Sequence, residues 1–328
     1  MTDRIPNSPP EIKPVTASNR PLWSVMIPTY NCISFLKATI ESVLQQDPGP
    51  ELMQIEVIDD FSTDGDVEAL VREVGKGRVS FYRQPQNRGS LRNFETCLNR
   101  AKGYYIHLLH GDDMVSPGFY NEIKALFEAN EEAGAAFVKN SYINENGYET
   151  GIERQIQETP GIINNWLEII ATRQRLQPPA IVVKREVYEK LGGFFAVHYG
   201  EDWEMYTRIA AHYPVAYSPK YLAKYRVHQN NITSRSYLAG QHIKDLKKVM
   251  QIIETYVPPE KRKSIRKNSL KIKSVWFARH ANAVYLKNPK AGLMHARNAL
   301  ALDFNLLSFG FSALVFLKYI SRWRRPRG

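Results

Sequence analysis

The chain has 328 residues, of which 43% are hydrophobic and 23% charged, so a wholly disordered or fibrous protein is excluded. This length predicts one large domain with an appendage. The net charge is +11, but residues 241–328 hold 19 Lys and Arg against four Asp and Glu, which leaves a mildly acidic body. This uneven charge argues against a nucleic-acid binder whose basic surface covers the whole fold.

Residues 1–21 are rich in proline and lack an apolar run, which predicts a disordered leader and argues against a signal peptide. Only two cysteines occur, Cys32 and Cys97. Neither has a partner at metal-finger spacing, so we expect reduced thiols in a cytoplasmic protein.

Short apolar runs and helically spaced apolar residues alternate from residue 22 to about 140. Strands are predicted at Trp23–Pro28, Ile55–Ile58, Val79–Tyr82, Tyr104–Leu109 and Ala135–Val138. Helices are predicted between them, at Ile33–Leu44, Val67–Val74, Leu91–Ala101 and Phe119–Ala129. The alternation predicts an α/β fold in which helices sandwich a mostly parallel sheet.

The pattern is less regular from 150 to 235, where helices are predicted at Arg185–Leu191 and Glu201–Ala211. We therefore expect one domain over 22–235 and a basic helical C-terminal region over 236–328. Its uncharged stretch Phe304–Leu317 would span roughly 21 Å as a helix, too short for a hydrocarbon core of about 30 Å. Because basic residues follow, a helix over 304–320 is predicted to lie on an anionic membrane surface. The alternative is a last helix that packs on its own domain.

Three acidic pairs stand where an α/β sheet binds its ligands. Asp59-Asp60 and Asp112-Asp113 each follow a predicted strand, and Glu201-Asp202 opens a helix. Carboxylates brought this close favour a cation, and oxygen ligands suit Mg²⁺ or Mn²⁺ shared with phosphate. The chain has no Walker loop and no G-x-G-x-x-G sequence, which argues against a P-loop or Rossmann nucleotide site.

Five motifs, in this order, resemble those of family-2 glycosyltransferases with the GT-A fold over residues 22 to 235. They are Ile27-Pro28-Thr29-Tyr30-Asn31, Val57-Ile58-Asp59-Asp60-Phe61-Ser62-Thr63-Asp64-Gly65, Asn87-Arg88-Gly89-Ser90, Gly111-Asp112-Asp113 and Glu201-Asp202. The resemblance implies inverting transfer of a sugar from a nucleotide-sugar donor to a hydroxyl acceptor, with Mg²⁺ or Mn²⁺. Asp60 accepting from the nucleobase is compatible with a UDP- or dTDP-sugar. The implied acceptor is a surface polysaccharide or a lipid-linked glycan.

The same resemblance implies roles for individual residues. Donor-binding residues would be Pro28, Tyr30, Asp59, Asp60, Arg92 and Asp112, and metal ligands Asp112, Asp113 and His228. Tyr30 and Asp60 would hold the nucleobase, whereas Asp59 would assist or only cap the next turn. His110 stands where the family commonly has a first Asp, which leaves open whether Asp112 or Asp113 binds the metal.

On the acceptor side, Asp202 matches the general base of the family. A carboxylate in the first turn of a helix is kept ionised by the helix dipole, as a base requires. Glu201 and Trp203 would lie on the acceptor side, with the alternative that Trp203 anchors its helix in the core.

Three other functions stay open at this point. A nucleotidyltransferase shares this sheet topology but normally carries a Gly-rich N-terminal loop with a basic residue. The second alternative is an inactive scaffold of the same fold, which the His at position 110 suggests. The third is a nucleic-acid binder that uses the basic tail, although no recognition motif accompanies the basic residues.

Overall fold

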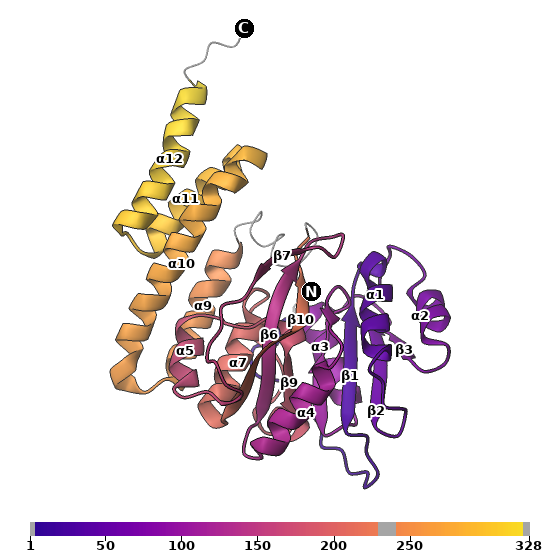
Figure 1. Ribbon diagram of the computed structural model, residues 1–328. Helices are drawn as coiled ribbons and strands as arrows, with labels where there is room; N and C mark the ends of the chain where they lie inside the picture. The colour runs from indigo at the N-terminus through magenta and orange to yellow at the C-terminus, as the bar shows by residue number, and fades with distance from the viewer. Residues whose placement is uncertain (1–3, 229–240, 324–328) are drawn as a thin grey trace. The chain divides into compact units, whose positions relative to one another are not determined.

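The computed structural model describes residues 4–228 and 241–323, and within them a ten-stranded mixed sheet forms the centre of the fold (Figure 1). Its main path is β3 (Ser80–Arg83), β2 (Met53–Asp59), β1 (Trp23–Thr29), β4 (Tyr105–Leu108), β9 (Ile181–Lys184), β6 (Ala135–Ile143), β10 (Val215–Arg226) and β5 (Met114–Val115). Off this path, β7 (Glu149–Ile152) pairs with β6 and β8 (Gly161–Ile162) pairs with β10.

The first four strands of this path are all parallel, and β10 is parallel to β6. Strand β9 joins the two parallel sets because it runs antiparallel to both β4 and β6. The predicted α/β fold with a mostly parallel sheet is therefore confirmed. The antiparallel position of β9 was not predicted, because a short apolar run such as 181–184 looks the same in sequence whether the strand is parallel or antiparallel.

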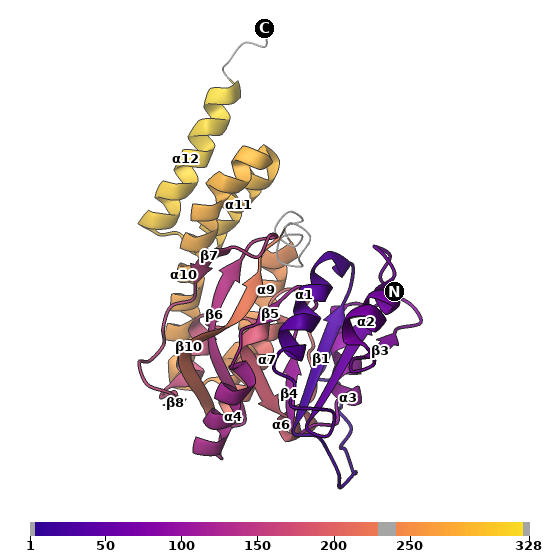
Figure 2. The ribbon, with the colours of Figure 1, turned by 45° about the vertical axis from the view of Figure 1, so that its right-hand side comes forward.

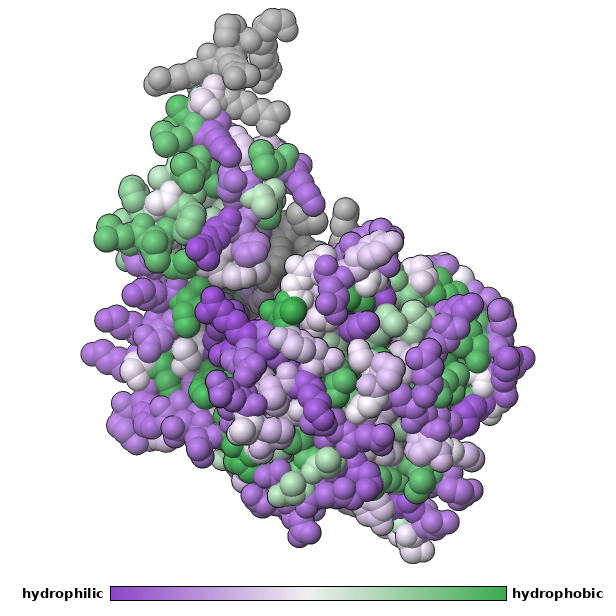
Figure 3. Space-filling view, in the orientation of Figure 1, coloured by the Kyte–Doolittle hydropathy of each residue, from purple (hydrophilic) through white to green (hydrophobic). Residues whose placement is uncertain are grey.

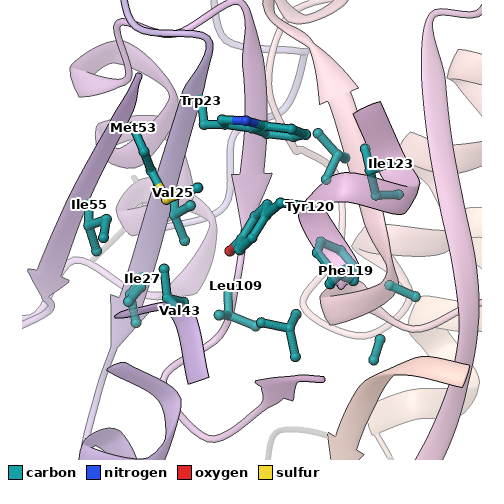
Figure 4. Close-up of a cluster of buried hydrophobic side chains, with 14 of the residues drawn as sticks. Trp23, Val25, Ile27, Val43, Met53, Ile55, Leu109, Phe119, Tyr120 and Ile123 are labelled. Carbon is teal, nitrogen blue, oxygen red and sulfur yellow. The ribbon is translucent and has the colours of Figure 1, made fainter. Parts of the chain in front are cut away.

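Helices cover both faces of the sheet (Figures 1 and 2). On one face, α1 (Ile33–Leu44), α2 (Val67–Gly75) and α4 (Phe119–Ala129) bury their apolar stripes in one cluster with Val25 and Ile27 of β1, and Figure 4 shows part of this cluster. Helices α3 (Ser90–Arg100) and α6 (Arg185–Leu191) add no residue to that cluster and pack on β1, β2 and β9. Helix α7 (Glu201–His212) packs on α6.

Strand β1 shows why this sheet is central to the fold. All seven of its residues are buried, as expected of a strand covered by helices on both faces. Alternate residues point to opposite faces, so the strand places whole apolar layers on each side. Its last residues lead directly into the loop that begins the candidate site.

The prediction of a disordered leader is wrong for residues 4–21. The carbonyls of Pro6 and Pro10 accept hydrogen bonds from Ala196 N and Gly193 N, at 2.9 and 2.8 Å, and the Ile12 side chain is buried. Proline lacks an N–H but keeps its carbonyl as an acceptor, so a proline-rich segment can lie extended against a folded surface. Composition alone did not reveal the buried isoleucine that anchors it.

Several short elements were also not predicted. Strands β5 and β8 have two residues each, too few for any periodic pattern, and β7 is an exposed hairpin strand. Strand β10 begins at Val215 and ends at Arg226. The helical turn η1 (Pro178–Ala180) precedes β9, and α5 (Trp166–Thr172) precedes η1 in the chain.

The chain divides into two compact units. One comprises Met1–Trp166 and Arg175–His228, and the other comprises Leu167–Gln174 and the chain from Gln229 onward. The predicted boundary at 235/236 lies outside the described residues.

The second unit is helical, with α9 (Gln241–Tyr256), α10 (Pro259–Lys287), α11 (Pro289–Leu302) and α12 (Leu306–Trp323). Asn288 ends α10 and caps α11, because its side chain accepts from Ala291 N at 3.1 Å. At Gly292 an added Cβ would lie 2.4 Å from the Tyr285 Cα, so only glycine allows α11 to cross α10 this closely.

Helix α12 carries large apolar side chains on its exposed side as well as at its packed face. Ser308, Ser312 and Val315 are buried, whereas Leu306 is 90% exposed and the preceding Phe304 is 71% exposed. Further large apolar side chains on the exposed side are Leu307, Phe309, Leu314, Leu317, Tyr319 and Ile320. They gather as hydrophobic surface over α12 (Figure 3). Among the described residues, no helix is both long and apolar enough to cross a bilayer.

Candidate active site

Three loops follow the carboxyl ends of parallel strands and meet at one edge of the sheet. Asp60 N donates to the Thr29 carbonyl at 2.8 Å, and Gly111 N donates to the Pro28 carbonyl at 3.1 Å. A Cβ at position 111 would lie 2.8 Å from Thr29 Oγ1, so glycine permits this close approach. Pro28 is buried, and its carbonyl binds the end of β1 to the loop that contains Gly111. The Tyr30 side chain, by contrast, is 44% exposed at the edge of the sheet.

Asp60 lies buried inside the turn that opens α3. Its carboxylate accepts from Arg88 N at 2.7 Å, from Gly89 N at 2.8 Å and from the Asn87 side-chain amide at 3.0 Å. Burial raises the pKa of Asp60, and the two backbone amides act in the opposite direction. The arrangement fixes the carboxylate in one orientation. Oδ2 already accepts from two of these donors, whereas Oδ1 accepts from Arg88 N and keeps a lone pair that can accept from a ligand.

Asp59 is fully buried and serves the loop that follows it. Its carboxylate accepts from Ser62 N at 3.1 Å and pairs with Arg83 at 2.9 Å. These contacts match the capping alternative. Arg92 projects from the first turn of α3 and pairs with Glu95 at 2.7 Å.

His110, Asp112 and Asp113 offer ligand atoms that all lie within 4.8 Å of one another. Asp113 Oδ1 accepts from Arg226 N at 2.8 Å, whereas Asp113 Oδ2 is buried and has no hydrogen-bond partner in the structure. Burial, and then the charge of Asp112, raises the pKa of Asp113 well above its usual value. An orphaned buried carboxylate oxygen in such a cluster fits a divalent cation, which would supply the missing partner.

His110 stands where the family commonly has an aspartate, and its ring lies beside the two aspartates that follow in the same loop. The imidazole stacks on Phe94, with ring centroids 5.1 Å apart, and belongs to the triad with both aspartates. The signal was present in the sequence, because histidine is a common ligand of transition-metal ions.

His228 does not belong to the triad but contacts one of its members, Asp112. Its Nε2 is 2.9 Å from Asp112 Oδ2, and its ring packs against Phe35 at 4.9 Å. Burial alone would raise the pKa of Asp112, but the hydrogen bond from His228 and the charges of His110 and His228 lower it below its usual value. Arg226, two residues earlier, donates through Nε to the Asp112 carbonyl at 2.8 Å, a role the sequence analysis missed.

The acidic end of α7 shares a pocket with His110. Glu201 and Asp202 line this pocket together with His110 and four aromatic rings, those of Phe94, Tyr188, Phe194 and Tyr206. Burial raises the pKa of Tyr206 well above its usual value, and the charges of Asp202, Glu201 and Asp113 add to the effect. The three residues His110, Asp112 and Asp113 are called the metal-type triad below. The pocket thus places the acidic pair of α7 beside His110 of this triad.

Trp203 does not line this pocket. Its side chain is 1% exposed within the first unit, which matches the alternative that the ring anchors α7 in the core. The ring therefore offers no face to a sugar in this structure.

Comparisons with known proteins identify the family of this chain. The family model "Glycosyl transferase family 2" matches residues 24–192, just over half of the chain. An uncharacterized glycosyltransferase of Haemophilus influenzae is 26% identical over 227 residues, which are 66% of this chain and 68% of that protein. The hyaluronan synthase of Pasteurella multocida is 28% identical over 151 residues, which are 45% of this chain but only 15% of the synthase.

Two solved structures share the fold. S. aureus TarS 1-349 in complex with UDP-GlcNAc has a TM-score of 0.62 at 15% identity, with 92% of each chain covered. The mannosyltransferase PcManGT of Pyrobaculum calidifontis, in complex with GDP-Man and Mn²⁺, has a TM-score of 0.56 at 20% identity. That alignment covers 97% of this chain and 85% of PcManGT. The chain therefore belongs to glycosyl transferase family 2 and is a glycosyltransferase with a GT-A fold.

Proposed function

We propose that this glycosyltransferase moves a sugar from a UDP- or dTDP-sugar to a hydroxyl group of a glycan or lipid-linked acceptor, with inversion at the anomeric carbon. The observation that carries the proposal is the single pocket lined by Asp202 and by His110 of the metal-type triad. For direct transfer, the group that activates the acceptor and the group that holds the donor diphosphate must lie in the same pocket.

Tyr30 and Asp60 are proposed to hold the nucleobase at the outer end of the site. The half-exposed ring of Tyr30 is available for packing, and the fixed carboxylate of Asp60 is available to accept from a base N–H. Arg92 is proposed to face the donor from α3. For Asp59 we propose only the structural role that its buried contacts support.

Asp112 and Asp113 are proposed to hold Mg²⁺ or Mn²⁺ together with His110, and His228 to orient Asp112. The bound metal ion would neutralise charge that develops on the leaving diphosphate. Arg226 and β10 keep the loop of the triad in place through two hydrogen bonds.

Asp202 is proposed as the general base that takes the proton from the acceptor hydroxyl. It lies in the first turn of α7, where the helix dipole favours the ionised carboxylate that a base requires. Glu201, on the same turn, is proposed to contact the acceptor.

We also propose that α12 docks on an anionic membrane surface at the cytoplasmic face. Several large apolar side chains of this helix, those of Leu306, Leu307 and Leu317 among them, are exposed, whereas a helix that only packs in water turns such side chains toward its core. Exposed Lys287 and Lys318 in the same unit suit anionic head groups. A lipid-linked acceptor would be found at such a surface.

A donor screen by thermal shift tests the proposed function. A ligand that binds only the folded state raises the melting temperature, so UDP- and dTDP-sugars with Mn²⁺ should stabilise the protein more than GDP- or ADP-sugars. Release of a nucleoside diphosphate from the bound donor should follow when an acceptor is added. Release of pyrophosphate would instead indicate a nucleotidyltransferase, and binding without any turnover would indicate an inactive scaffold.

A further inference from the structure

The N-terminal segment over residues 4–20 lies along the first unit as an extended strap. It is held by Pro6 and Pro10 through their carbonyls, by the buried Ile12, and by Lys13 N, which donates to Asn99 Oδ1 at 3.1 Å. Near its C-terminal end, Arg20 donates to the carbonyls of Lys102 and Gly103. No part of the proposed mechanism uses this segment.

At the other end of the strap, Arg4 binds the turn that surrounds Asp60. Its guanidinium donates to Asn87 Oδ1 and, at 3.3 Å, to the Asn87 carbonyl. Because Asn87 Oδ1 accepts from Arg4, the amide nitrogen of the same side chain faces Asp60. It donates there to Asp60 Oδ2 and to the Asp60 carbonyl, both at 3.0 Å. Arg4 therefore selects one of the two orientations of the Asn87 amide.

The guanidinium also lies over Gly89, whose amide binds Asp60. An added Cβ at Gly89 would stand 3.1 Å from Arg4 Nε, and the residue has a φ of +89°. The positive charge of Arg4 lowers the pKa of Asp60 against the larger effect of burial, so it favours the ionised carboxylate. Arg4 is thus connected to Asp60 by geometry, through Asn87, and by charge.

The strap also contacts the loop that leads into α7. Pro6 O accepts from Ala196 N, and Ala196 has a φ of +75° in a tight turn closed by Val197 N and Phe195 O at 3.0 Å. A non-glycine residue in such a γ-turn is strained and persists only where its surroundings hold it. One short segment therefore holds both the donor-side turn and the loop that precedes Asp202.

We propose that Arg4 is a positioning residue for donor binding, which acts through Asn87 to hold the Asp60 carboxylate in the orientation that accepts from the nucleobase. This inference rests on the proposed function, in which Asp60 contacts the base. Arg4 touches neither the metal-type triad nor Asp202, so its removal should weaken donor binding and leave the chemical step largely intact.

The experiment compares Arg4→Ala with Arg20→Ala, a matched control that removes the other strap arginine with side-chain hydrogen bonds to backbone carbonyls. Calorimetric titration with UDP and dTDP in the presence of Mn²⁺, together with kcat and KM for the donor, gives the readout. Arg4→Ala should raise the donor Kd and KM about fivefold to tenfold with kcat nearly unchanged, and Arg20→Ala should leave all three unchanged. Arg4→Lys should recover only part of the loss, because lysine lacks the paired donors.

A double-mutant cycle tests the route through Asn87. In the Asn87→Ala background, Arg4→Ala should cause a much smaller loss of donor affinity than it does in the wild-type background, because only its charge still acts on Asp60. Unchanged affinity in Arg4→Ala, an equal loss in Arg20→Ala, or fully additive losses in the cycle would each overturn the inference while the proposed function stands. A wild-type protein that binds no nucleoside diphosphate would overturn both.

Discussion

The imidazole of His228 lies 2.9 Å from the carboxylate of Asp112, although the two residues are 116 positions apart in the sequence. The contact ties the end of β10 to the loop after β4, and Arg226 strengthens the same tie through Asp112 and Asp113. The loop of the triad follows β4, but its orientation therefore also depends on β10, which does not belong to the parallel set of β1 to β4.

Removal of this imidazole should weaken metal binding. A partner that orients a ligating carboxylate typically contributes a factor of about 10 to 100 in metal affinity, so His228→Ala should lower Mn²⁺ affinity by that factor. Mn²⁺ titration followed by electron paramagnetic resonance, with UDP present, measures it. The exposed His280 provides the control, since His280→Ala should bind Mn²⁺ normally. Unchanged affinity in His228→Ala would contradict the orienting role, and complete loss would favour direct ligation.

The histidine in the triad should set the choice of metal. Imidazole nitrogen suits transition-metal ions, whereas Mg²⁺ prefers oxygen ligands. His110→Asp should therefore raise Mg²⁺ affinity relative to Mn²⁺, measured by competition of Mg²⁺ against bound Mn²⁺. The same competition in wild type is the reference. An unchanged ratio of the two affinities would show that His110 does not ligate the ion.

Buried His107 should make stability depend on pH. Its Nε2 donates to the Pro179 carbonyl at 3.1 Å, so Nδ1 accepts from Tyr120 O–H at 3.2 Å, and burial lowers its pKa to about 3. The unfolded chain binds this proton below a pH of about 6.5 and the folded chain does not. The contribution is therefore constant above pH 6.5 and declines by about 1.4 kcal/mol per pH unit below it.

At pH 5 this residue alone should lower the free energy of unfolding by about 2 kcal/mol relative to pH 7. Urea denaturation of His107→Gln should show a pH dependence smaller by that amount, while the exposed His212→Gln keeps the wild-type dependence. A histidine resonance that fails to titrate between pH 8 and 5 should vanish from the spectrum of His107→Gln. An equal pH dependence in wild type and His107→Gln would contradict the neutral state.

Vesicle binding tests the outward apolar face of α12. Replacing Leu306, Leu307 and Leu317 by serine should reduce sedimentation with anionic vesicles at least about tenfold and leave neutral vesicles unaffected. Tyr148→Ser is a suitable control, because Tyr148 is 71% exposed but lies outside α12. Truncation before Phe304 should have the same effect as the triple substitution and spare donor binding. Vesicle binding that survives both changes would contradict the membrane role.

The sheet and its acidic edge were predictable because each central strand is an apolar run that ends at a polar residue. Trp23–Thr29 and Met53–Asp59 are buried on both faces, and this leaves a strong signal in the sequence. The placement of Asp60 and Asp112 at one edge then followed from parallel topology alone.

Contacts between distant residues were not predictable in the same way. Residues 4–21 are held in place by the buried Ile12 and by proline carbonyls that accept hydrogen bonds. A proline-rich composition by itself predicts disorder, so these contacts were not foreseen. The burial of Trp203 depends on which face of α7 meets the core, and no local pattern fixes this. The membership of His110 in the triad required the backbone turn after β4.

The most direct measurement is donor binding and sugar transfer by Asp202→Asn, which keeps the shape of the side chain and removes its basicity. We expect donor affinity within about threefold of wild type and transfer reduced by about 10² to 10⁴. The melting temperature should stay near that of wild type, since Asp202 lies at the start of α7 and lines the pocket. Near-normal transfer by this variant would contradict the assignment of Asp202 as the general base.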